Sequence, residues 1–150
     1  MAAFRKYFIA FIFILGGVTG CKKDINTNPS PASPYITASC NNTFVAFTGT
    51  VKVVSSQYTI NGTSSANSTI QIGFSAPGIG NYKLGFGQAI FTSPNGESWH
   101  TTTSDTGTVY VSALTSNSIT GSFNFYASET SPTLGGSTLT VNSGNFYLTW

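Results

Sequence analysis

The chain has 150 residues, with six Lys and Arg against four Asp and Glu, 40% hydrophobic residues and two cysteines. This length suits a single domain, and the scarcity of charge excludes the basic stripe with which proteins hold nucleic acid. Solubility must therefore rest on Ser, Thr and Asn.

The first twenty residues have the features of an export signal. Arg5 and Lys6 are basic, and residues 7–15 (YFIAFIFIL) are uninterrupted apolar sequence. A helix over residues 7–18 would span only about 18 Å, well short of the roughly 30 Å hydrocarbon core of a bilayer. The segment therefore predicts a cleaved signal peptide over residues 1–20 rather than a membrane-spanning helix.

The last three residues of this segment and the next one, Val18-Thr19-Gly20-Cys21, resemble the bacterial lipobox, in which an aliphatic residue and two small ones precede an obligatory cysteine. The resemblance implies cleavage between Gly20 and Cys21, a thioether to diacylglycerol on Cys21, and fatty acylation, typically with palmitate, of the new amine. Two or three acyl chains anchor a protein stably, whereas a single chain binds only reversibly. The alternative is an ordinary signal peptide with an accidental cysteine.

Residues 21–34 are expected to form the lipidated cysteine and a flexible linker. The stretch 22–34 (KKDINTNPSPASP) contains three prolines and almost no apolar residues, so it has nothing to pack against. Fully extended, it reaches at most about 45 Å. Its Lys-Lys-Asp start is similar to that of many Bacteroidota lipoproteins. We expect a lipid anchor in the outer membrane, with the domain on the cell surface or the periplasmic face.

Residues 35–150 alternate apolar and polar residues and are enriched in Thr, Val, Tyr and Phe, which is typical of half-buried strands. Turn signals separate the strands at Asn61-Gly62, Pro77-Gly78, Pro94–Gly96, Ser116-Asn117, Gly135-Gly136 and Ser143-Gly144. The residues expected to face the core are Ile36, Ala38, Cys40, Ile70, Ile72, Phe74, Val109, Val111, Ile119, Phe123, Phe125, Phe146, Leu148 and Trp150. The pattern predicts an all-β domain: an antiparallel β-sandwich or, alternatively, a small closed β-barrel.

Four segments of this domain carry a second resemblance. They are Gly80–Leu84 (GNYKL), Gly107–Val111 (GTVYV), Ile119–Phe125 (ITGSFNF) and Val141–Phe146 (VNSGNF). Together they resemble a family of small Bacteroidota lipoproteins whose all-β domain has no assigned function. The resemblance implies a cell-envelope lipoprotein, a hairpin at the last segment and no known activity.

The sequence offers little for catalysis or metal binding. His100 is the only histidine, and Glu97, Asp105 and Glu129 each lie beside a turn signal rather than in a common pattern. Cys40 has no partner in the chain if Cys21 is acylated, and its phase predicts a small buried side chain. We therefore expect no enzyme, no metal and no cofactor.

The aromatic residues are the better candidates for ligand contact. Tyr110, Tyr126 and Tyr147 are out of phase with the predicted core, and Trp99 lies on the hairpin after Gly96. Outward tyrosines can stack on sugar rings, but they also stabilise sheets as cross-strand pairs. The sequence thus predicts a lipid-anchored structural or protein-interaction module of the envelope or, alternatively, a surface glycan- or ligand-binding module.

Overall fold

The computed structural model describes residues 33–104, 106–130 and 136–150. These residues form ten antiparallel strands: β1 (Tyr35–Cys40), β2 (Thr43–Val54), β3 (Gln57–Ser64), β4 (Thr69–Ser75), β5 (Gly80–Leu84), β6 (Ala89–Thr92), β7 (Ser98–His100), β8 (Gly107–Leu114), β9 (Ser118–Glu129) and β10 (Thr138–Thr149). The all-β prediction is confirmed. The signal peptide, Cys21 and nearly all of the linker lie outside the described residues, as do Asp105 and Gly135.

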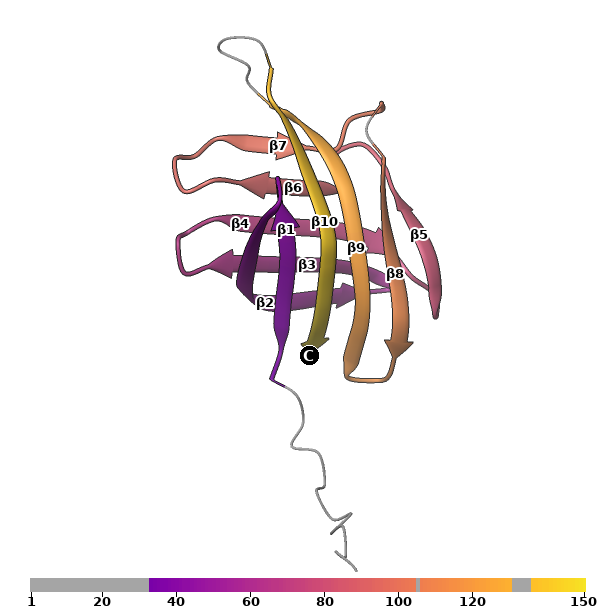
Figure 1. The fold of residues 1–150 in the computed structure, drawn as a ribbon. Helices are drawn as coiled ribbons and strands as arrows, with labels where there is room; N and C mark the ends of the chain where they lie inside the picture. The colour runs from indigo at the N-terminus through magenta and orange to yellow at the C-terminus, as the bar shows by residue number, and fades with distance from the viewer. Residues whose placement is uncertain (1–32, 105, 131–135) are drawn as a thin grey trace, which may run out of the picture. The chain divides into compact units, whose positions relative to one another are not determined.

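The sheet closes on itself as a barrel, the second of the two predicted architectures. The strand order β10-β1-β2-β3-β4-β6-β7-β9 returns to β10, because β9 also pairs with β10. β8 pairs with residues 119–125 of β9, and β5 extends the sheet beyond β8. In Figure 1, β3, β4, β6 and β7 cross behind β1, β10, β9 and β8. The barrel is therefore flattened into two crossed layers that share one core.

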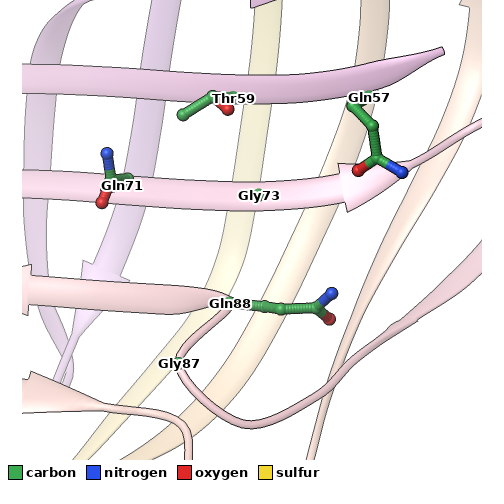
Figure 2. Close-up of a pocket in the computed structure, with 6 residues that line it drawn as sticks. All are labelled: Gln57, Thr59, Gln71, Gly73, Gly87 and Gln88. Carbon is green, nitrogen blue, oxygen red and sulfur yellow. The ribbon is translucent and has the colours of Figure 1, made fainter. Parts of the chain in front are cut away.

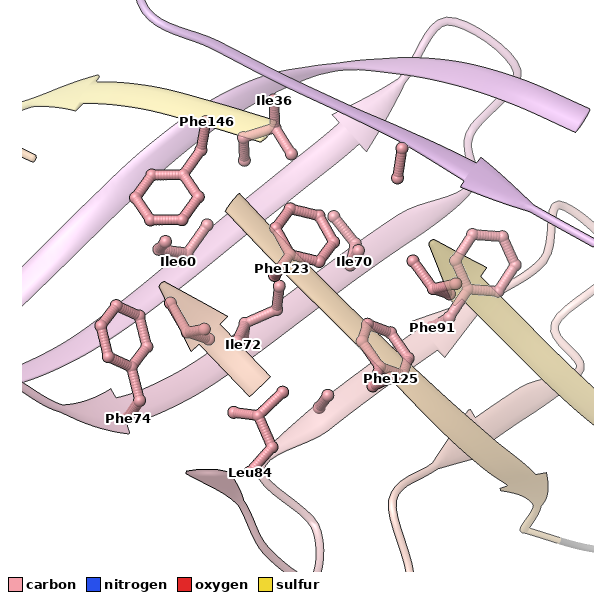
Figure 3. Packing of buried hydrophobic residues seen from close by; sticks show 14 of the residues in the cluster. Ile36, Ile60, Ile70, Ile72, Phe74, Leu84, Phe91, Phe123, Phe125 and Phe146 are labelled. Atoms are coloured by element: carbon pink, nitrogen blue, oxygen red, sulfur yellow. The ribbon is translucent and has the colours of Figure 1, made fainter. Parts of the chain in front are cut away.

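The core fills the space between these layers. Figure 3 shows phenylalanines and isoleucines of both layers meeting there, and the rings of Phe123 and Phe146 stack with centroids 6.3 Å apart. Every residue that the alternation placed in the core is buried, except one. Trp150 follows the end of β10, is 44% exposed, and meets Tyr58 edge-on with ring centroids 6.0 Å apart.

Cys40 is buried, as predicted, among apolar side chains. It is 7% exposed and is a free thiol. Burial raises the pKa of this thiol from 9.0 to about 11, because the apolar surroundings disfavour the thiolate.

Two of the predicted turns are wrong. Asn61-Gly62 lies inside β3, where a Cβ on Gly62 would come within 2.9 Å of Ile70 and Phe47. The glycine allows close packing there rather than a change of direction. Ser143-Gly144 lies inside β10 and forms a bulge, in which Ser143 adopts a φ of 50°. The expected last hairpin is therefore one continuous strand.

The other described turn signals are confirmed. Pro77-Gly78 joins β4 to β5, Pro94–Gly96 joins β6 to β7, and Ser116-Asn117 joins β8 to β9. A further turn joins β1 to β2, where Asn41 and Asn42 have φ values of 45° and 65°. Asparagine tolerates this left-handed conformation better than most residues, so the tight hairpin forms without glycine.

Candidate binding groove

The outer surface of β3 and β4 and the loop before β6 together form a groove of about 310 Å³. Figure 2 shows the residues that line it, which we call the amide groove: Gln57, Thr59, Gln71, Gly73, Gly87 and Gln88. Three of the six are glutamines, two are glycines, and all are uncharged. The volume lies at the lower end of the range of roughly 300–1,000 Å³ that is usual for small-molecule sites.

Strand pairing explains why a hollow forms here. Thr59 pairs with Gly73, and the amide N–H of Gly73 donates to the carbonyl of Gln88 at 2.7 Å. Because Gly73 has no side chain, the sheet surface is low at its centre. The glutamines stand around this low point, since Gln57 and Gln71 point outward from their strands and Gln88 precedes β6.

Each glutamine amide is held at one end by a hydrogen bond. Gln71 donates from Nε2 to Asn61 Oδ1 at 3.0 Å, Gln57 donates to the hydroxyl of Ser75, and Gln88 Oε1 accepts from the backbone N–H of Gly85 at 2.6 Å. Among the described residues, the other end of each amide has no hydrogen-bond partner. The groove therefore presents oriented donors and acceptors to a ligand.

A second depression of about 300 Å³ continues the surface past Gln71. Its lining also includes Asn61, Thr63, Thr69, Ile90 and Thr92. The row Thr63–Thr69–Thr92–Ser98 runs across four neighbouring strands, so its hydroxyls follow one another at the strand spacing of about 4.8 Å. The polar surface is thus longer than the amide groove alone.

An exposed aromatic ring stands beside the groove. Phe86 precedes Gly87 and is 67% exposed. Its ring meets His100 edge-on with centroids 5.7 Å apart, and His100 pairs with Ile90 of the second depression. The surface therefore combines an amide- and hydroxyl-bearing strip with an apolar edge. The cation next to the groove along the strand pairing is Lys52 of β2, which pairs with Thr59.

The tyrosines suggested by the sequence lie on the other layer, and the structure does not gather them into one site. Tyr110 is 44% exposed on β8 and Tyr126 is 55% exposed on β9. Tyr110 pairs with Ser122, four residues from Tyr126 and therefore about 13 Å away along β9. Tyr147 is half-buried and lies beside Tyr35, with ring centroids 6.4 Å apart.

Trp99 belongs to neither surface. Its half-buried ring packs against Phe91 with centroids 6.0 Å apart, and its Nε1 donates to Ser137 Oγ at 2.9 Å. Ser137 Oγ in turn donates to Glu129 Oε2 at 2.8 Å. Trp99 thus fastens β7 to the residues before β10, which is a structural role.

The remaining chemical candidates are dispersed. Glu97 is exposed in the β6–β7 hairpin, and His100 Nδ1 hydrogen-bonds with Thr130 Oγ1 at 2.9 Å. Within residues 33–104, 106–130 and 136–150, no group of three His, Cys, Asp or Glu side chains could hold a metal ion. The same residues include no helix long and apolar enough to cross a membrane.

The glutamines of the groove were missed in the sequence. Thr59, Asn61 and Thr63 alternate with apolar residues, as do Gln71 and Gly73, and this polar half of the pattern was a usable signal. It indicated two neighbouring strands with amide- and hydroxyl-bearing outer faces. Gln88 gave no such signal, because it lies outside a strand.

Fold and surface together define an all-β barrel domain with an uncharged polar groove on its wall. The chain belongs to the family described as domain of unknown function (DUF6252), whose profile matches residues 32–149. The expectation of a domain without an assigned function is thereby confirmed. No curated protein and no solved structure matches the chain.

Proposed function

We propose that this protein is a lipid-anchored, non-catalytic binding module of the cell envelope that holds a neutral saccharide in the amide groove. The observation that carries the proposal is the groove itself: three oriented glutamine amides around a glycine floor, with an uncharged lining. Sugar hydroxyls are paired donors and acceptors, which planar amides match well.

The lining itself supports a neutral sugar, because it has no charged residue and Lys52 lies one strand outside it. Phe86 offers an exposed ring against which the apolar face of a sugar can pack. Neither of the described glutamates lines the groove: Glu97 is exposed in the β6–β7 hairpin, and Glu129 accepts hydrogen bonds from Ser137. The groove therefore binds without supplying the paired acids of a glycoside hydrolase.

The anchor rests on the sequence. The basic start, the apolar run 7–15 and the lipobox-like residues 18–21 occur in order, and acylation of Cys21 follows from them. Mass spectrometry of the membrane-extracted protein tests this: the N-terminal peptide should begin at Cys21 and carry acyl groups, and Cys21→Ser should abolish both. Protease treatment of intact cells then separates the cell surface from the periplasmic face.

Calorimetric titration with neutral gluco-, xylo- and manno-oligosaccharides tests the groove. Gly73→Val places a side chain on the groove floor and should abolish binding, while Gln71→Ala should weaken it about tenfold, the equivalent of one lost hydrogen bond. Tyr110→Ala is the matched control on the other layer and should leave affinity and melting temperature unchanged. Failure of the whole panel to bind, or preference for an acidic oligogalacturonate, would contradict a neutral-saccharide site.

The tyrosine layer is a second candidate, favoured by the outward pair of Tyr35 and Tyr147. It predicts the opposite result, in which Tyr147→Ala or Tyr110→Ala loses binding and Gly73→Val does not. If neither surface binds a saccharide, the remaining reading is a structural or protein-interaction module.

A further inference from the structure

One end of the barrel carries exposed apolar side chains from four separate segments. Tyr35 begins β1, Val54 ends β2, Ile79 lies before β5, and Trp150 follows β10; they are 41%, 56%, 64% and 44% exposed. We call these four residues the apolar end. Figure 1 shows the start of β1, the end of β10 and the β8–β9 turn together at this end, the lower one in the view.

Contacts beneath the surface connect most of this end. The Trp150 ring packs on Tyr58, whose ring stacks on Phe74 with centroids 5.6 Å apart. Phe74 lies beside Tyr82, with ring centroids 6.3 Å apart, and the Tyr82 hydroxyl donates to the Gly78 carbonyl at 2.7 Å, next to Ile79. A cluster of packed aromatic rings thus fills this end of the barrel.

Two further contacts bring in the other members. The turn after Val54 is bonded to the β4–β5 connection, since the N–H of Ala76 donates to the carbonyl of Ser56 at 3.0 Å. Tyr35 pairs with Tyr147, three residues before Trp150. Val54, Ile79, Trp150 and Tyr35 therefore border the same closed end.

The charge distribution distinguishes this end from the rest of the barrel. The segments that form it, residues 33–35, 53–58, 75–82, 113–120 and 145–150, contain no Lys, Arg, Asp, Glu or His, and the exposed Lys52 and Lys83 lie directly beside two of them. Glu97, His100 and Glu129 lie on or beside β7, near the start of β10. A surface with exposed Trp, Tyr, Ile and Val, bordered by lysines, suits the boundary between lipid headgroups and acyl chains, where Trp and Tyr concentrate.

We propose that the apolar end rests on the surface of the lipid bilayer, so that the barrel is docked on the membrane as well as tethered to it. The position of the linker indicates that lipid, rather than another partner, covers the apolar end. Residues 22–34 join Cys21 to Tyr35, which is itself a member of the apolar end, and they reach at most about 45 Å. The contact rests on the proposed acylation of Cys21, which would keep this end at a high effective concentration next to lipid.

The two tryptophans of the chain allow a direct test. Trp150 belongs to the apolar end and Trp99 packs beside β7, so Trp99→Phe and Trp150→Phe each leave one reporter. A chain beginning at Cys21 contains every part of the closed barrel, because the core cluster lies between Ile36 and Leu148. It can be coupled through the Cys21 thiol to a maleimide lipid in phosphatidylcholine–phosphatidylethanolamine vesicles, since Cys40 is buried.

Lipid brominated near the headgroup end of its acyl chains then quenches any tryptophan that docks. We expect about twofold quenching and a blue shift of Trp150, since interfacial side chains lie about 5–10 Å deep, and no quenching of Trp99. Equal quenching of both tryptophans, or none of Trp150, overturns the proposal. If Trp150 is shielded in lipid-free solution and light scattering shows a dimer, a second copy of the chain covers the apolar end instead. If Trp150 is shielded only when an envelope protein is added, that protein covers it.

Charge placed at the apolar end provides the matched comparison. The double variant Val54→Glu/Ile79→Glu should lose the Trp150 quenching, and Phe44→Glu should keep it. Phe44 is 70% exposed but lies next to the β1–β2 hairpin, so it controls for a charge on an equally exposed residue away from this end. Unchanged quenching in the double variant overturns the contact. Absence of acyl groups on the cellular protein overturns the anchor and with it the contact, whereas an acylated chain without Trp150 quenching overturns the contact alone.

Discussion

Replacing glycine by alanine should have opposite effects on the stability of the domain at two positions, Gly121 and Gly73. Gly121 lies in β9 between β8 and β10, and a Cβ there would overlap the carbonyl oxygen of Tyr110 and come within 2.6 Å of Phe146 Cζ. Gly73 lies in β4, where the nearest atom to a Cβ is the carbonyl oxygen of Gln88 at 3.9 Å. The backbone oxygen in the first case cannot move without breaking the sheet.

The magnitude follows from these distances. Overpacking a core typically costs about 1–3 kcal/mol, and the backbone contact puts Gly121→Ala near the upper end. Replacing glycine by alanine returns about 0.5–1 kcal/mol through the lower entropy of the unfolded chain, which leaves a net loss of about 2 kcal/mol. Gly73→Ala keeps only the favourable part and should stabilise by up to about 1 kcal/mol.

Urea unfolding followed by tryptophan fluorescence measures both values, and thermal melting checks them. At about 4 °C per kcal/mol for a domain of this size, Gly121→Ala should lower the melting temperature by about 8 °C. Gly73→Ala should leave it unchanged or raise it. Equal effects of the two substitutions would refute the close approach of β8 and β10 around Gly121.

Two further predictions concern the hairpin between β1 and β2. Burial raises the Cys40 pKa from 9.0 to about 11, so as the pH rises the thiol ionises first in the unfolded chain. The contribution of the buried neutral thiol to the free energy of unfolding is therefore complete below pH 9 and is lost as the pH rises towards 11. Urea midpoints measured against pH should show this loss in the wild type and lack it in Cys40→Ala. Asn41 Oδ1 accepts the Thr140 N–H at 2.9 Å, and Asn41→Gly, which keeps the left-handed φ, should cost about 1 kcal/mol. No difference in unfolding free energy would show that this bond contributes nothing.

The core could be predicted from the sequence because alternation is a local property. Successive side chains of a strand point to opposite faces, so Ile70, Ile72 and Phe74, which are two residues apart, all face inward. Trp150 is in phase with Leu148 and packs on Tyr58, but it follows the last residue of β10 and lies at the rim of the barrel, so its ring stays 44% exposed.

The closure of the barrel could not be predicted in the same way. It depends on β1 pairing with β10, which joins Tyr35 to Tyr147 across almost the whole domain. Turn chemistry was equally ambiguous: the same Asn-Gly or Ser-Gly dipeptide that suits a hairpin also suits close packing at Gly62 and a bulge at Gly144. Only the neighbouring strands decide which of these applies.

The groove was hidden for a related reason. Outward amides and hydroxyls read as solvated surface, and a depression appears only when Gly73 is placed between Gln57, Gln71 and Gln88. Tyr110 and Tyr126 were correctly expected to face outward, but their distance from each other depends on strand order and register. The alternation along one strand predicts which side chains are exposed, whereas a binding site depends on how several strands are arranged.

The groove and the apolar end are linked by β3. Val54 of the apolar end pairs with Gln57, which lines the near end of the amide groove. Thr92 of the second depression is in register, through Thr69, with Thr63, which lies six residues further along β3. A barrel docked through Val54 and Trp150 would therefore hold the Gln57 end of the polar surface close to lipid and the Thr92 end away from it. If both proposals hold, a saccharide longer than the groove must extend past Thr92, because the bilayer blocks the other direction. Docking would then fix the direction from which a polymeric ligand enters, which a flexible linker alone could not do.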